Sequence, residues 1–251
     1  MFEINLLGTQ LIPIFGEAGS AGLQSLGSIL QVFWSSWGER IIVASWESLY
    51  MVFIATLFSY LGGLPLAIIL VITDRGHIME NLRVNKALGF IVNMTRSIPF
   101  IIFLILLIPL TKIIVGTFIG TVASIVPLTL AAVPFVARLV ETSLKEVEWG
   151  LIEASLSMGA SHWQIIYKVL LPEALPSIVL GISITAINLV GYSAMAGIVG
   201  GGGLGTLAYY YGYQRGIIGV LWATVIVLII LVQLVQMAGE KLSGAITKKR
   251  R

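Results

Sequence analysis

The stretch EASLSMGASHWQIIYKVLLPEALPSI, Glu153 to Ile178, places carboxylates, a histidine, a lysine, a glycine and two prolines between two strongly apolar runs. Gly159 is a residue that commonly ends a helix, and Ser161 is a suitable N-cap for a second one. Pro172 and Pro176 then mark a turn back into the apolar part. The stretch predicts two short helices joined by a tight bend, a shape suited to docking.

Both predicted helices have an apolar face. In the first helix, the residues that can share a face are Leu151, Ile152, Ser155 and Met158. In the second, apolar residues recur at intervals of three and four, at Trp163, Ile166, Val169 and Leu170.

Composition decides the class of protein. Of 251 residues, 57% are hydrophobic and 11% are charged, whereas a soluble domain carries about a quarter charged residues. The mean hydropathy is +0.99. We therefore expect an all-α integral membrane protein. The absence of cysteine from the sequence excludes disulfides and thiolate metal sites.

Crossing about 30 Å of hydrocarbon as a helix takes roughly 20 apolar residues. Of the five segments that meet this condition, only the second contains a charged residue, Arg96. The five predicted transmembrane helices are residues 48–73, 87–111, 116–137, 174–199 and 216–239.

The positions of lysine and arginine predict the orientation. Five spans place eleven of these residues on one side of the membrane and three on the other. The richer side is expected to be cytoplasmic, which puts the N-terminus outside and the C-terminus in the cytoplasm. The stretch that opens at Glu153 then falls in the cytoplasmic connection from Arg138 to about Pro172, and the tail Lys248–Arg251 lies beside anionic lipid headgroups.

Residues 1–45 are treated as a separate extracytoplasmic or interfacial segment, and residues 46–251 as the transmembrane domain. Phe33, Trp34 and Trp37 suit a helix at the outer interface, and a partly disordered leader is the alternative. A sixth span would reverse the charge asymmetry. The first ten residues lack the basic start of a signal peptide.

Arg96 lies near the middle of the second predicted span, where an arginine costs roughly 2.5–3.5 kcal/mol. Pro99 removes a backbone hydrogen bond and can bend this helix. Arg96 is either a gate element that meets a substrate carboxylate or an interhelical clamp on a carbonyl freed near Pro99. We favour the clamp.

The fourth predicted span carries a second polar group. Asn188, Tyr192 and Met195 have the spacing of one helix face and, with Ser193, either line a translocation path or form an ordinary helix–helix interface.

Three sequence motifs of nucleotide-binding or catalytic sites were considered, and none is accepted as a functional site in this chain. Gly200–Gly205 fits G-x-G-x-x-G, but it follows a membrane helix and reads as a flexible outer loop. The serine of GYSA has no histidine within reach, since His77 and His162 fall in predicted cytoplasmic loops as solvated residues. No G-x-x-x-x-G-K-[ST] motif occurs, so the chain does not bind ATP by that route.

The polar stretch resembles the coupling motif of ABC-importer membrane subunits. Glu153-Ala154-Ser155, Gly159 and Leu171-Pro172 stand at the family's spacing, with Ser155 replacing an alanine and Val169 an isoleucine. NMTRSIPFIIFLILLIPLT (93–111), LVGYSAMAGIVGGGGLG (189–205) and YYYGYQRG (209–216) are similar to methionine-importer permeases.

This resemblance implies a type I ABC-importer permease, a homodimer with five helices per copy. It implies two cytoplasmic ATPase subunits, which bind the ATP and Mg, and an extracytoplasmic substrate-binding protein. No cofactor is expected in this chain, and no nucleic acid partner. The alternatives are another small amino acid or peptide as substrate, an intramembrane enzyme or a secondary transporter.

The resemblance also assigns roles to residues. The short helix before Gly159 would seat in a groove of the ATPase subunit. Its tip would be formed by small residues, namely Ala154, Ser155, Ser157 and Ala160. Glu153 would place its carboxylate near the positive end of that helix.

Overall fold

The computed structural model describes the backbone of residues 20–248 and the side chains of residues 31–246. These residues form helices and no strand, which confirms the all-α prediction. The tail from residue 249 onward lies outside the described residues. The chain divides into two units, Met1–Val43 and Ala44–Arg251, which are described separately.

The first unit contributes the beginning of α2, which runs from Ser20 to Ile72. Val32, Trp34 and Ile42 of this part are exposed. The predicted helix around the aromatic run is therefore present, and its position at the outer interface stays a prediction. The first span was predicted to begin at residue 48, but α2 continues through this residue without a break, so no helix begins there.

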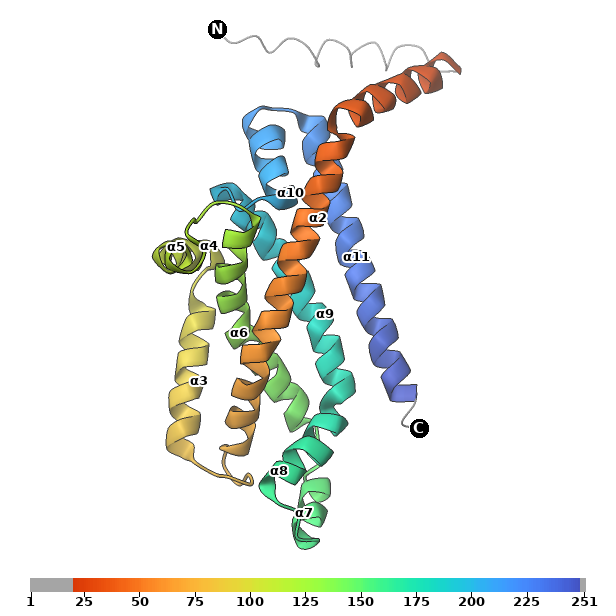
Figure 1. The fold of residues 1–251 in the computed structure, drawn as a ribbon. Coiled ribbons are helices and arrows are strands. Elements are labelled where there is room, and N and C mark those ends of the chain that lie inside the picture. Colours follow the sequence, from red (N-terminus) through yellow and green to blue (C-terminus); the bar gives the residue numbers. More distant parts are fainter. Residues whose placement is uncertain (1–19, 249–251) are drawn as a thin grey trace. The chain divides into compact units, whose positions relative to one another are not determined.

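The second unit continues from α2 through short and long helices (Figure 1). Its elements are α3 (Leu82–Ser97), α4 (Phe100–Leu106), α5 (Ile108–Val115), α6 (Thr121–Lys145), α7 (Trp149–Ser157), α8 (His162–Ile165), the π-helical turn η2 (Ile166–Leu170), α9 (Leu171–Ala196), the 3₁₀ turn η3 (Gly197–Val199), α10 (Gly203–Thr206), the π-helical η4 (Leu207–Gln214) and α11 (Ile218–Lys248).

Four helical stretches of the described chain are long and apolar enough to cross a membrane: Gln31–Ile72, Thr121–Lys145, His162–Val199 and Ile218–Ile246. The pair α3 and α4 passes the same test together, but the two helices are bent by 103°. The predicted number of five spans is therefore reached only if this bent pair counts as one.

The predicted span 87–111 is not one continuous helix, and the bend that Pro99 was expected to allow is present. Ile98 is extended, as the residue before a proline usually is, and its amide donates to the Thr95 carbonyl at the end of α3. Pro99 then starts α4 in a new direction, and a second break at Leu107 precedes α5. With 16 residues, α3 is about 24 Å long and does not by itself cross the hydrocarbon.

The third span also differs from its predicted bounds of 116–137. Gly116 adopts a left-handed conformation that ends α5, so α6 starts five residues later, at Thr121. It then continues past Pro127 and Pro134 to Lys145. Arg138 and Lys145 therefore lie on a helix instead of in a connecting segment.

The turn predicted at Pro172 and Pro176 is absent, because helical structure continues from His162 to Val199. Pro172 cannot donate a backbone hydrogen bond and sits in the first turn of α9. The π-helical turn Ile166–Leu170 precedes it, and the Leu171 amide reaches the Ile166 carbonyl. The second helix of the polar stretch is thus the start of the fourth span.

Two apolar cores hold the second unit together, and α9 contributes to both. One core joins α2, α6, the α7–α8 region and α9, with Val71, Val140, Ile152 and Ile165 among its members. The other core joins α2, α4, α6 and α9 around Met51. In Figure 1, α6 and α9 run side by side, and α7 and α8 lie beyond their far ends.

The glycine run after α9 is a packed turn, so the prediction of a flexible loop is wrong. The Gly203 amide donates to Glu47 Oε2 at 2.7 Å, and the Leu204 amide donates to Ser48 Oγ at 2.9 Å. A Cβ on Gly205 would lie 2.3 Å from the Ala194 carbonyl oxygen. Glycine is required here because two backbone segments touch.

Replacing Gly205 by alanine is expected to destabilise the protein by about 1–3 kcal/mol, because the backbone must move to admit the methyl group. Gly244→Ala is the matched control, since a Cβ at this helical position meets nothing within 4 Å. Thermal unfolding of both purified variants measures the difference. Equal midpoints would contradict the packed turn.

Candidate functional site

The bend between α7 and α8 is built from local signals that the sequence shows. Gly159 has φ +81°, in the left-handed region that favours glycine. The Gln164 amide donates to Ser161 Oγ at 3.3 Å, and the Ser161 amide donates to Gln164 Oε1 at 2.8 Å. This reciprocal capping box fixes the start of α8. The predicted helix end and N-cap are confirmed.

One face of α7 anchors the bend to the protein. Ile152 and Ser155 are buried, and Ile152 packs with Ile165 and Ile166 in the first core. Leu151 and Met158, predicted on the same face, are exposed. The prediction fails for Met158 because the helix ends one residue earlier, at Ser157, so helical spacing no longer places this side chain.

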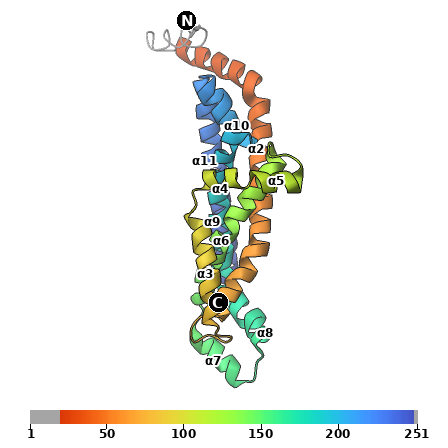
Figure 2. The same ribbon diagram turned by 90° about the vertical axis from the view of Figure 1, so that its left-hand side faces the viewer.

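The other face of the bend is exposed and partly apolar. Met158 is 80% exposed and Trp163 is 69% exposed. A hollow of about 450 Å³ lies beside them, lined by Ser155, Met158, Gly159, Ala160, Gln164, Lys168 and Val169. Figure 2 shows α7 and α8 at one end of the second unit. Large apolar side chains exposed to this extent are available for contact with another protein.

The remaining residues of the predicted coupling motif have different environments. Glu153 and Ala154 are exposed on α7, whereas Leu171 and Pro172 are half-buried where α9 begins. Since α7 starts at Trp149, Glu153 lies in its second turn and not in the first. The predicted interaction with the helix dipole is wrong, because that effect fades within the first turn.

The segment after α2 contacts α7 through His77. Its ring meets the Trp149 ring edge-on, with centroids 5.4 Å apart. His77 is thus half-buried, and the prediction of a solvated histidine is wrong. Burial lowers the pKa of His77 below its ordinary value; Asp74 opposes this effect and Lys145 adds to it.

An ion-pair network connects this segment to two helices. Glu141, only 6% exposed, accepts from Arg138 at 2.7 Å and from Lys145 at 3.0 Å. Lys145 also pairs with Asp74 at 2.7 Å, and this interaction lowers the pKa of Asp74. Arg138 donates further to the Gly89 carbonyl of α3 at 3.1 Å.

Sequence reasoning missed this network. The available signal was the spacing of Arg138, Glu141 and Lys145, which places opposite charges on neighbouring turns of one helix. Asp74 carries no such signal, because its partner lies far along the chain.

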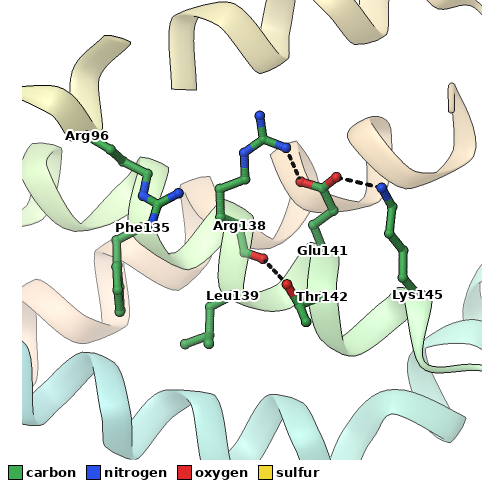
Figure 3. A pocket seen from close by; sticks show the side chains of 7 residues that line it. All are labelled: Arg96, Phe135, Arg138, Leu139, Glu141, Thr142 and Lys145. Atoms are coloured by element: carbon green, nitrogen blue, oxygen red, sulfur yellow. Dashed lines mark hydrogen bonds and ion pairs between the residues drawn. The ribbon is translucent and has the colours of Figure 1, made fainter. Parts of the chain in front are cut away.

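Arg96 lies in the last turn of α3, beside a hollow of about 370 Å³. Figure 3 shows the residues that line it: Arg96, Phe135, Arg138, Leu139, Glu141, Thr142 and Lys145. Arg96 is exposed, and the described part of the chain gives it neither a hydrogen bond nor an ion pair. The clamp that we favoured is not formed there, and the gate role stays a prediction.

The four polar candidates on α9 are not brought together. Asn188 and Met195 are exposed, and Tyr192 stacks on Phe100 with centroids 4.5 Å apart. Ser193 is buried and donates to the Val190 carbonyl at 2.8 Å. Ser193 therefore belongs to the interior, and a path along this helix would use the face of Asn188 and Met195.

Removing the Glu141 charge is expected to destabilise the protein more than removing that of Asp74. Glu141→Gln leaves two cations without their shared carboxylate, at a cost of about 1–3 kcal/mol. Asp74→Asn costs less than about 1 kcal/mol, because the Asp74 side chain is 35% exposed and its ion pair is screened by solvent. Thermal unfolding of the two variants gives the order, and the reverse order would contradict the network.

The His77 contact is expected to weaken in acid. The folded pKa lies below the ordinary value near 6.5, so the folded state binds fewer protons than the unfolded state. The resulting stability is present above pH 6.5 and is lost as the pH falls through the folded pKa.

His77→Phe keeps the ring but removes this titration. Its thermal midpoint should fall less than that of the unchanged protein between pH 7.5 and pH 5.5. His162→Phe, at an exposed position, is the control and should keep the full pH dependence. Identical slopes for the unchanged protein and His77→Phe would refute the assignment.

Comparisons with known proteins match this architecture. Residues 63–246 match the family described as binding-protein-dependent transport system inner membrane component. A Vibrio cholerae relative, named probable D-methionine transport system permease protein MetI, is 54% identical over 204 residues, covering 81% of this chain and 91% of the relative. The protein of the same name from Pasteurella multocida is 49% identical over 205 residues, covering 82% and 94%.

A solved structure titled as an inward-facing conformation of the MetNI methionine ABC transporter aligns with a TM-score of 0.81 and 49% identity. The alignment covers 82% of this chain and 96% of that one. The fold is therefore that of a type I ABC-importer permease. Since the family model covers most of the chain, this protein belongs to the binding-protein-dependent transport system inner membrane components, the multi-pass permease subunits of ABC importers.

Proposed function

We propose that this chain conducts methionine across the bacterial inner membrane as the permease subunit of an ATP-driven importer. The relatives from Vibrio cholerae and Pasteurella multocida, at 54% and 49% identity, are named for D-methionine transport. The similar solved structure is titled as a methionine ABC transporter. These names support methionine as the substrate.

One observation carries the mechanism: the bend between α7 and α8 is rigidly held on one face and exposed on the other. Ile152 packs in the core and Ser155 is buried, while Glu153, Ala154 and Met158 remain exposed. A lever that takes force from another protein needs both properties. Ser155 then acts as support for α7, and Ala160, which is half-buried, lines the hollow beside the exposed side chains.

The partners follow from this mechanism. The sequence has no P-loop motif, so the energy comes from two ATPase subunits that grip the bend on the cytoplasmic side. A second copy of this chain completes the pore, and an extracytoplasmic substrate-binding protein delivers the amino acid. The N-terminus is then extracytoplasmic, as the distribution of Lys and Arg predicts.

The translocation path lies on the exposed face of α9 that carries Asn188 and Met195. Tyr192, stacked on Phe100 of α4, links this face to the bent helix pair. Closure of the ATPases would move the bend, and alternating access to the path would follow. Ser193 positions α9 from inside the protein and does not touch the substrate.

Uptake by proteoliposomes that contain the permease and its ATPase, with the binding protein added outside, tests the substrate. D- and L-methionine should accumulate only with ATP inside. Accumulation of another amino acid in preference to both would overturn methionine as the substrate, and ion-driven uptake without the ATPase would overturn the importer.

Gly159→Pro is expected to abolish co-purification of the ATPase and uptake, because proline cannot adopt the positive φ of the bend. Gly116→Pro is the matched control. Gly116 has φ +83°, its amide also donates a hydrogen bond, to Lys112, and it lies outside the bend. The control should retain the ATPase. Retention of the ATPase by both variants would refute the role of the bend in ATPase coupling.

A further inference from the structure

The hollow between the end of α3 and the last turns of α6 has more cationic groups than its own carboxylate can neutralise. Arg96, Arg138 and Lys145 line it together with Glu141. Asp74 adds a second negative charge through its ion pair with Lys145. Three positive charges against two negative ones leave one positive charge in this cluster.

The unused donors belong to the two arginines. Glu141 already holds Arg138 and Lys145, and Lys145 also holds Asp74. Arg138 Nε is buried and has no hydrogen-bond partner. Arg96 has neither a hydrogen bond nor an ion pair within the described chain. A buried polar group normally has a partner, so Arg138 Nε points to a missing acceptor. The exposed guanidinium of Arg96 lines the same hollow and can donate to that acceptor as well.

We propose that this hollow binds one oxyanion group, the carboxylate of a small solute, between Arg96 and Arg138. A guanidinium group presents paired N–H donors that match the two oxygens of a carboxylate. The volume of about 370 Å³ falls in the range of small-molecule sites. Phe135 and Leu139 also line the hollow, and in Figure 3 they extend to the other side of α6 from Arg138 and Glu141.

A lipid headgroup could supply the same chemistry through its phosphate. Arg96 is the fifteenth residue of α3, about 21 Å along the helix axis from Leu82. This depth favours a small solute over a headgroup at the membrane surface. The inference rests on the proposed function: the solute is the transported amino acid, and the hollow is a contact for its carboxylate separate from the α9 face of Asn188 and Met195.

The test is equilibrium binding of radiolabelled methionine to the purified permease–ATPase complex without the binding protein. The complex is held in nanodiscs of phosphatidylcholine and, separately, of phosphatidylcholine with phosphatidylglycerol. Arg96→Gln should weaken binding at least tenfold, and Arg96→Lys should restore part of it. Arg83→Gln is the matched control, because Arg83 is exposed on the same helix and outside the hollow. Methioninamide, which lacks the carboxylate, should not compete.

Equal binding by the Arg96→Gln and Arg83→Gln complexes overturns the inference, as does full competition by methioninamide. If Arg96→Gln lowers only the phosphatidylglycerol retained in native mass spectra and leaves methionine binding unchanged, the oxyanion is lipid phosphate and the solute site is overturned. Absence of methionine binding to the unchanged complex also overturns the site, whereas ATP-driven uptake with the binding protein tests the proposed function separately.

Discussion

Inside a bilayer, every backbone amide and carbonyl must find its hydrogen-bond partner within the protein, and this constraint decides where the helices of this chain can break. The second apolar segment breaks at Pro99, which has no amide hydrogen to leave unpaired. The glycine turn after α9 is not helical, yet the Gly201 amide reaches the Ala196 carbonyl and the Gly120 amide reaches the Gly200 carbonyl. In this turn, other parts of the chain supply the acceptors that a helix would otherwise provide.

The sequence predicted the structure well wherever the residues of a single helix determine its conformation without contacts from distant segments. The helix of residues 171–196 and the 3₁₀ turn after it fall close to the predicted span 174–199, because a long uncharged apolar run can satisfy its backbone only as a helix. The break at Pro99 was different. A proline shows where a helix is weakened, but the 103° turn depends on what α4 packs against, including Tyr192 of a distant helix.

The same distinction separates the two parts of the candidate site. Gly159 and Ser161 carry local chemistry, a left-handed turn and a capping box, so the bend could be predicted from residue types alone. The contacts of Asp74 with Lys145 and of His77 with Trp149 join residues about seventy positions apart, and only the fold brings them together. For this reason a histidine assigned to solvent is half-buried, and a lysine assigned to a loop ends a membrane helix.

These contacts explain how a force on α7 would reach the membrane helices. Ile152 packs in the same core as Val71 of α2, Val140 of α6 and Ile178 of α9, so a shift of α7 must be shared by three helices or open a void. His77 adds a second contact to the segment after α2, and Arg138 extends the ion-pair network to α3. Since close-packed interiors transmit displacement instead of absorbing it, the exposed bend can move the helices around the charged hollow together.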